Sequence, residues 1–219
     1  MSRIYSEQHR SWQDQFDSRR LADRIEEIAV KTEVGPDEKM FIESRDMFFL
    51  STTDDRGRPT VSYKGGEPGF VKVIDEQTIA FPTYDGNGMY FSVGNISTNA
   101  EVGLLFIDFE KPHRLRLQGT ASVSTDDPLK DAWKEAELVV RIRVSELWQN
   151  CPRYVHRYQK VQTSRYVPKD GEDTPFCEWK RIDGMQDVLR PHELEEVERS
   201  GNITMEEWGQ RVVDGADDA

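Results

Sequence analysis

The sequence predicts a mainly β protein with flanking helices, in which an antiparallel barrel forms the centre of the chain. Three observations predict this class. About seven strand-like segments, separated by short turns, fill residues 46–146 around one helical insertion. Closely spaced strands with few helices between them favour an antiparallel barrel over a sheet of βαβ units. Helical patterns lie before and after this region, and such helices would cover the barrel's openings or its edge strands.

The N-terminal region, residues 1–45, is predicted to form helices that pack on the barrel. Within residues 10–30, Leu21, Ile25 and Ile28 recur with helical spacing and give one apolar stripe on a charged helix. The ordinary role of such a stripe is to dock against the main domain. Gly35-Pro36-Asp37 then ends this helix and begins a short second one.

The central region, residues 46–183, is predicted to hold the barrel. Met47–Thr53 is a strand-like run, and the turn after it contains Gly57, so the chain should return as a hairpin that ends at Tyr63. The remaining strands are predicted from apolar runs and alternation, and a short helix is predicted among them. The strands are 70–74, 78–81, 102–107, 115–123 and 139–144, and the helix is 89–99.

The C-terminal region, residues 184–219, is predicted to be an acidic helical tail. Residues 189–219 carry nine acidic and three basic side chains. A helix is expected at 187–199, and Thr204 and Glu207 have the spacing of a capping box.

Composition excludes several classes of protein. The chain has 219 residues and a formal charge of −12, which argues against a general binder of nucleic acid or of anionic membranes. No apolar run approaches the ~20 residues of a membrane span, and the N-terminus has no apolar signal-peptide core, so a soluble cytoplasmic protein is expected. Two cysteines are too few for a disulfide scaffold or a cysteine-rich zinc module, and four scattered histidines predict no metal site.

One segment opposes the acidic background. Residues 138–169 carry seven basic side chains against Glu146 alone, and tyrosines and Trp148 are interleaved with them. The segment could bind a phosphate-bearing ligand or single-stranded nucleic acid. It could equally be a counter-surface for the acidic tail or a contact between subunits. The overall charge makes nucleic acid the weakest of these alternatives.

Two glycine-bearing loops are the candidate ligand site. They are Ser62–Phe70 and Phe81–Met89. Glycine lets a backbone approach a ligand closely and offers N–H groups to phosphate oxygens. Lys64 would add positive charge, and the helix after the second loop would point its N-terminus at the same place. Ordinary hairpin turns are the alternative.

These loops and the strands around them resemble the pyridoxamine 5′-phosphate oxidase-related, FMN-binding split-barrel family. The resemblance covers about residues 40–125 and weakens towards 180. It rests on the order and spacing of several segments together. They are Leu50–Ser62, Lys64–Val71, Thr78–Pro82, Gly86-Asn87, Asn95-Ile96, Val102–Phe106 and Leu115–Gly119.

The resemblance implies a six-stranded split β-barrel that forms a homodimer, with FMN in grooves between the subunits. It implies an oxidoreductase in which a hydride arrives from a nicotinamide donor or another small-molecule substrate. The cofactor-binding residues it implies are Ser62, Lys64, Pro82, Thr83, Asn87 and Met89, with Arg116 and Gln118 as further candidates. Candidate walls of the substrate site are Tyr154, His156, Tyr158 and Trp179.

The sequence departs from the family at two places. Met89 stands where relatives often have an arginine, a natural phosphate clamp, so Lys64 or the basic segment would have to supply the charge. Otherwise the site would hold another ligand, such as FAD or a deazaflavin. The substrate-binding arginine and histidine pattern of the true oxidases is also missing near the C-terminus. A non-catalytic protein that binds a flavin, a deazaflavin or another planar cofactor therefore stands beside the enzyme as an alternative.

Overall fold

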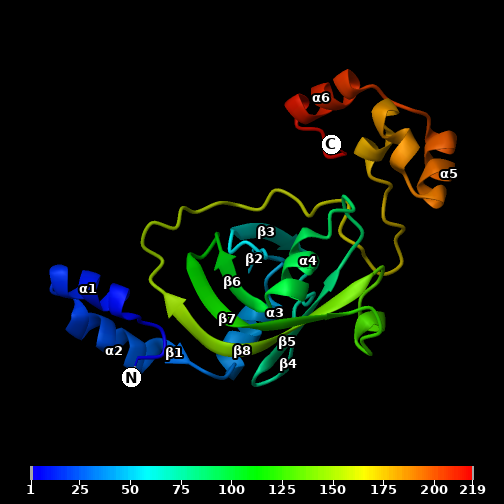
Figure 1. Ribbon diagram of the computed structural model, residues 1–219. Helices are drawn as coiled ribbons and strands as arrows, with labels where there is room; N and C mark the ends of the chain where they lie inside the picture. Colours follow the sequence, from blue (N-terminus) through cyan, green and yellow to red (C-terminus); the bar gives the residue numbers. More distant parts are fainter. Residues whose placement is uncertain (1, 219) are drawn as a thin grey trace. The chain divides into compact units, whose positions relative to one another are not determined.

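The computed structural model describes residues 2–218 and divides the chain into two compact units. The units are Met1–Gln159 and Lys160–Ala219 (Figure 1). The sequence-based boundaries after residues 45 and 183 separate regions by element type rather than by contact, and they stay a prediction. Within the described part of the chain, no helix is both long and apolar enough to cross a membrane.

The first unit is built on one antiparallel sheet. Its strand order is β3-β2-β6-β7-β8-β5-β4, and the short β1 pairs with β8. The sheet confirms the mainly antiparallel class with flanking helices, but not the expected six strands, since the described residues form eight. Their bounds are β1 Val30–Lys31, β2 Met47–Thr53, β3 Pro59–Gly65, β4 Lys72–Asp75, β5 Thr78–Thr83, β6 Glu101–Asp108, β7 His113–Ser124 and β8 Leu138–Asn150.

The sheet is open but strongly curled around its core. Strands β2 and β5 have three strands between them, so in a flat sheet they would lie about 19 Å apart. Yet the rings of Phe48 on β2 and Phe81 on β5 are 5.0 Å apart, and Phe106 on β6 lies 5.1 Å from Phe48. These three side chains are fully buried, so the curl closes the sheet around an aromatic centre.

One glycine permits the bend of the two longest strands. The register of β7 against β8 shifts between Gln118 and Gly119. A Cβ at Gly119 would lie 2.3 Å from the carbonyl oxygen of Arg143 on β8, so no other residue fits without moving the backbone. Such a bulge increases the local twist of the strand pair and helps the sheet to curl.

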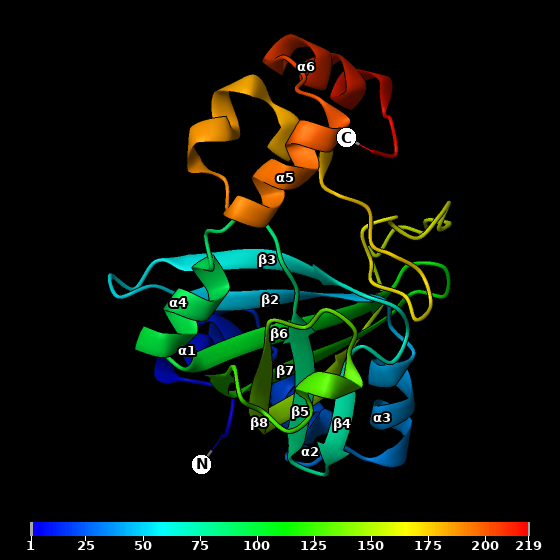
Figure 2. The same cartoon turned by 90° about the vertical axis from the view of Figure 1, so that its right-hand side faces the viewer.

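Four α-helices flank this sheet: α1 Glu7–Gln15, α2 Arg19–Ala29, α3 Pro36–Glu43 and α4 Phe91–Thr98. The single helix expected over 10–30 is wrong, because the chain reverses between α1 and α2, where Asp17 adopts a left-handed conformation. Helix α3 begins at Pro36 as expected, buries Ile42 and lies beside β4 (Figure 2). Helix α4 packs against β2 and β7.

The second unit is helical. It contains the 3₁₀ segments Glu178–Arg181 and Asp183–Val188, then α5 Pro191–Ser200 and α6 Met205–Asp214. The expected capping box of α6 is present, because Thr204 Oγ1 accepts a hydrogen bond from the backbone N–H of Glu207. A buried ion pair between Lys180 and Glu193, 2.6 Å apart, joins the first 3₁₀ segment to α5.

Candidate functional site

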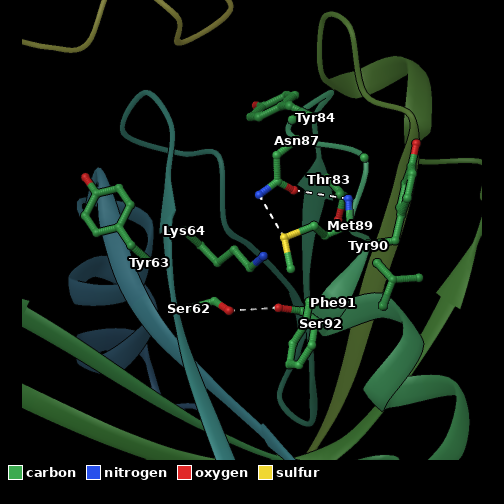
Figure 3. Close-up of a pocket in the computed structure, with 13 residues that line it drawn as sticks. Ser62, Tyr63, Lys64, Thr83, Tyr84, Asn87, Met89, Tyr90, Phe91 and Ser92 are labelled. Carbon is green, nitrogen blue, oxygen red and sulfur yellow. Dashed lines mark hydrogen bonds between the residues drawn. The ribbon is translucent and has the colours of Figure 1, made fainter. Parts of the chain in front are cut away.

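A cavity of about 290 Å³ opens between β3, the end of β5 with the loop after it, and the start of α4. Figure 3 shows Lys64 reaching from β3 towards the loop, whereas Tyr63 points to the other side of the strand. The cavity is lined by Ser62, Tyr63, Lys64, Thr83, Tyr84, Gly86, Asn87, Gly88, Met89, Tyr90, Phe91, Ser92 and Val93. The second glycine-bearing loop predicted from the sequence lines the cavity, whereas the first contributes only its start, Ser62–Lys64 on β3, and none of its glycines.

Lys64 is the one cation in this lining. Its side chain is half-buried, and burial lowers the pKa of its ammonium group below the usual range. Across residues 2–218, no hydrogen bond or ion pair compensates this charge. A half-buried, uncompensated cation at a cavity wall is chemically suited to an anionic ligand.

The loop at Gly86–Tyr90, opposite Lys64, exposes its backbone to the cavity. Asn87 shapes it, since its Oδ1 accepts a hydrogen bond from the backbone N–H of Met89 at 3.1 Å. Gly88 has φ = 72°, and a Cβ at Gly86 or Gly88 would meet no atom within 4 Å. Tyr90 is also left-handed, with φ = 44°, and turns the chain into α4. The peptide groups of the loop are therefore accessible to a ligand.

A buried polar cluster fixes α4 beneath the cavity. Asn95 Nδ2 donates to Thr52 Oγ1 at 3.0 Å, and the hydroxyls of Thr52 and Thr60 are also 3.0 Å apart. Nearer the cavity, the hydroxyls of Ser62 on β3 and Ser92 on α4 are 3.0 Å apart. These contacts hold the N-terminal turn of α4 at the cavity wall, where its unpaired N–H groups and dipole favour an anion.

The lining is poor in groups that transfer protons at neutral pH. It contains no histidine, cysteine, aspartate or glutamate. Burial, with a smaller contribution from the charge of Glu135, raises the pKa of Tyr84 to about 12. Tyr84 therefore stays neutral and can donate a hydrogen bond. Tyr90, which lines the cavity, donates from its Oη to Glu137 Oε2 at 2.7 Å, and Glu137 is not part of the lining.

The cavity brings together five of the eight predicted cofactor residues: Ser62, Lys64, Thr83, Asn87 and Met89. The other three lie elsewhere. Pro82 is buried in β5 opposite Val139 of β8. Arg116 and Gln118 are exposed on β7 and do not line the cavity.

The four predicted substrate-wall residues are also not in the lining. Tyr154 and His156 are exposed in the segment after β8. The ring of Tyr158 packs edge-on against Phe109 at 5.5 Å. Trp179 belongs to the second unit.

Sequence reasoning missed the aromatic part of the lining, which consists of Tyr63, Tyr84, Tyr90 and Phe91. The signal that could have found these residues is their position inside or next to the two glycine-bearing loops.

Several charges of the basic segment 138–169 are satisfied within their own unit. Arg141 makes a bidentate pair with Asp127, at 2.5 and 2.9 Å. Arg157 Nε donates to the carbonyl oxygen of Glu110 at 3.0 Å. These two charges therefore have partners in the first unit, a structural role different from the expected counter-surface for the acidic tail or subunit contact, which stay predictions. Among the described residues, no group of three or more histidine, cysteine or acidic side chains could hold a metal ion.

Comparison with known proteins gives one family match. The family model described as pyridoxamine 5′-phosphate oxidase matches residues 36–158. No curated protein matches the chain significantly.

Solved structures with a similar core include HupZ from Group A Streptococcus, which is 18% identical, with 57% of this chain and 99% of that chain covered and a TM-score of 0.45. A candidate pyridoxamine 5′-phosphate oxidase from Lactobacillus delbrueckii is 22% identical, with 54% and 95% covered and a TM-score of 0.43. An FMN-binding protein from Syntrophomonas wolfei is 12% identical, with 63% and 96% covered and a TM-score of 0.40. These distant likenesses carry no argument about function.

Proposed function

The chain belongs to the pyridoxamine 5′-phosphate oxidase family, and from this premise we propose that it is an FMN-binding oxidoreductase that transfers a hydride to or from a small molecule. The curled open sheet is, in this proposal, the family's split barrel. Its location would be cytoplasmic. A nicotinamide is the proposed hydride donor.

The half-buried Lys64 is the observation that carries the proposal. Its charge has no compensating partner within residues 2–218, it lines the cavity, and burial lowers its pKa. A phosphate group would compensate this charge and would accept hydrogen bonds from the loop at Gly86–Gly88 and from the start of α4. Ser62, Thr83 and Asn87 can supply further hydrogen bonds to phosphate or ribityl oxygens.

These donors fit the phosphate end of FMN even though Met89 replaces the arginine of many relatives. One ammonium group, a helix N-terminus and open peptide N–H groups are the ingredients of a phosphate site. Met89 lines the same cavity, so its thioether would contact the ligand without adding charge. Because only one cation is present, we expect weaker binding than an arginine clamp would give.

The cavity of one chain is small for a ligand pocket. Its volume of about 290 Å³ is at the lower limit of the roughly 300–1,000 Å³ of typical ligand pockets. Large apolar side chains around it are exposed, namely Val61, Tyr63, Met89, Tyr90 and Phe91. A second copy that covers these side chains would enclose the flavin ring, so we propose a homodimer with the site at its interface. Arg116, Gln118 and the wall candidates could then approach from that copy.

The flavin, when bound, supplies the hydride chemistry, and the protein binds and orients it. Lys64 and the loop would hold the phosphate. Neutral Tyr84 could donate a hydrogen bond to a ring or ribityl oxygen. The described lining offers no carboxylate or imidazole as a general acid or base, which suits hydride transfer.

The same lack of proton-transfer groups supports a second candidate, a protein that binds FMN, FAD, a deazaflavin or another planar cofactor without turnover. The two candidates differ in the behaviour of the bound flavin. The enzyme should reoxidise or reduce its flavin in a cycle linked to a nicotinamide or another small molecule. The pure binder should keep a fixed flavin spectrum.

The first test is to titrate the purified full chain with FMN and to follow quenching of the flavin fluorescence. Lys64→Ala should weaken binding by roughly 10–100-fold, because it removes a charge-assisted hydrogen bond. Lys111→Ala, at an exposed turn of the same unit, is the matched control and should bind like the wild type. Equal affinity of the wild type and Lys64→Ala would refute the proposed role of Lys64. If FMN binds, NADH-dependent bleaching under anaerobic conditions separates the enzyme from the binder.

A further inference from the structure

Met89 places an exposed thioether at the wall of the cavity. Its side chain is 64% exposed, and the residue belongs to the cavity lining. Peroxides oxidise exposed thioethers to methionine sulfoxide, which turns an apolar side chain into a polar one. The new oxygen is a strong hydrogen-bond acceptor. Oxidation of Met89 therefore changes the chemistry of a candidate ligand site, whereas oxidation elsewhere on the surface would not.

Asn87 fixes both the backbone and the sulfur of Met89. Its Oδ1 accepts a hydrogen bond from the backbone N–H of Met89 at 3.1 Å, and its Nδ2 donates to the Met89 sulfur at 3.3 Å (Figure 3). A thioether is a weak acceptor, so the second contact contributes more to position than to stability. The sulfur is thus held at a defined place in the lining, although methionine side chains are flexible in general.

The Lys64 side chain reaches towards the loop that carries this sulfur (Figure 3). Lys64 is the one cation of the lining, and within residues 2–218 no hydrogen bond or ion pair compensates its charge. The thioether of Met89 offers an ammonium group little, because sulfur accepts hydrogen bonds only weakly. A sulfoxide oxygen on the same side chain would offer both Lys64 and Asn87 a strong acceptor.

We propose that Met89 is a peroxide-sensitive residue of this cavity, whose oxidation to the sulfoxide gives Lys64 a hydrogen-bond acceptor and so weakens binding of a phosphate-bearing ligand. The sulfoxide oxygen competes with a phosphate oxygen for the ammonium group, and its negative end repels the phosphate. The effect on the ligand rests on the proposed function. The effect on Lys64 does not.

Hydrogen peroxide is the oxidant, and the reaction balances without a further reactant. The sulfur lone pair forms a bond to one peroxide oxygen while the O–O bond breaks. The other oxygen leaves as hydroxide and becomes water with the proton of the transferred OH group. The sulfur loses two electrons, and the peroxide gains them. Because Met89 lines the cavity itself, peroxide reaches the sulfur along the path of the ligand, also where a second copy covers the rim.

Two other methionines are matched controls. Met40 on α3 is 68% exposed and Met205 on α6 is 57% exposed, so exposure alone predicts similar oxidation at all three sulfurs. Neither Met40 nor Met205 lines the cavity. The double variant Met40→Leu, Met205→Leu leaves Met89 as the one strongly exposed methionine of residues 2–218.

Amine labelling of the full chain tests the link to Lys64. In the double variant, mild hydrogen peroxide should add one oxygen to Met89, as site-resolved mass spectrometry reports. Acetic anhydride at pH 8 should then label Lys64 several-fold more slowly, because a hydrogen bond to the sulfoxide favours the ammonium over the reactive amine. Lys111, at an exposed turn, should react equally before and after oxidation.

Two results of this experiment would overturn the proposal. One is labelling of Lys64 that does not change once Met89 is fully oxidised. The other is a wild-type chain in which Met89 stays reduced while Met40 and Met205 are oxidised.

Fluorescence titration with FMN tests the consequence for the ligand. Peroxide should weaken FMN binding to the double variant by roughly 5–10-fold and should not change the affinity of the same variant with Met89→Leu added. Methionine sulfoxide reductases should restore both FMN affinity and Lys64 labelling. Unchanged FMN affinity after full oxidation of Met89 would also overturn the proposal. A chain that binds no FMN before oxidation refutes the proposed function, and Lys64 labelling then decides the role of Met89.

Discussion

Lys64 lowers the stability of the fold but supplies the positive charge of the proposed binding site. Burial lowers its pKa, so the charged form is less stable in the folded chain than in the unfolded one. We expect Lys64→Met to raise the free energy of unfolding by about 1 kcal/mol in urea titrations at pH 7, while FMN binding weakens by roughly 10–100-fold, as in Lys64→Ala.

The sign of the pH dependence is set by the same lowered pKa. Between the folded pKa of Lys64 and its higher unfolded value, the unfolded chain binds more protons, so stability rises with pH in this window. The advantage of Lys64→Met over the wild type should therefore be full below the folded pKa and should shrink as the pH rises through it. Two results would contradict the prediction that the buried charge of Lys64 destabilises the fold. One is a stability difference between Lys64→Met and the wild type that stays constant over this pH range, and the other is a Lys64→Met variant less stable than the wild type.

Helix α4 is the element that places both the anion-binding turn and Ser92. It reaches only from Phe91 to Thr98, and its position depends on the buried contact of Asn95 with Thr52. Asn95→Ala should lower the unfolding free energy by roughly 1–3 kcal/mol, because Thr52 is buried and loses a donor.

The same variant should weaken FMN binding several-fold, since the N-terminal turn of α4 would be less firmly held. Ser97→Ala, on the exposed side of the same helix, is the control and should change neither property by more than about 0.5 kcal/mol. Urea unfolding and the fluorescence titration measure both effects. Equal stability of Asn95→Ala and Ser97→Ala would show that the polar cluster does not anchor α4.

At the element scale, local sequence patterns predicted where strands and loops lie. They predicted less well which side of the sheet a strand's side chains face. Alternation and turn residues found β2, β3 and β7, because these signals lie within a few neighbouring residues. The break between α1 and α2 was missed, since the left-handed Asp17 has no distinctive neighbours. Arg116 and Gln118 lie on the exposed face of β7, which depends on the register with β6 and β8, and their expected place near the flavin stays a prediction.

At the scale of the whole molecule, a count of charges left the role of residues 138–169 open between ligand binding and a structural counter-surface. In the structure Arg141 pairs with Asp127, and Arg157 donates to the carbonyl oxygen of Glu110. Such partners are fixed by strand pairing and by the path of a loop, which a count of charges does not contain. Ser62 and Lys64 were placed with the second glycine-bearing loop from the family resemblance, and the cavity does bring them together, but through the middle of β3 and the curl of the sheet rather than through the first loop's glycines.

The second unit has a small apolar core, so its buried ion pair should control its acid stability. Burial alone would raise the pKa of Glu193, but hydrogen bonds from Arg190 and Lys180 outweigh it and lower the pKa to about 2. A carboxylate with a lowered pKa stabilises the fold above its unfolded pKa, and this stabilisation is lost as the pH falls through the folded value. The window for Glu193 runs from about 4.5 down to about 2.

Hydrogen exchange of residues 160–218 in the full chain should therefore speed up as the pH falls from 5 to about 2.5, after correction for intrinsic rates. Glu193→Gln should show fast exchange already at pH 7, because the buried Lys180 loses the carboxylate that it pairs with at 2.6 Å, at a cost of roughly 3–5 kcal/mol. The double variant Lys180→Met, Glu193→Met removes both charges and should keep its protection with a flatter pH profile. Glu195→Gln, on the exposed side of α5, should follow the wild type. A wild-type profile as flat as that of the double variant would mean that this pair does not govern the acid stability of the unit.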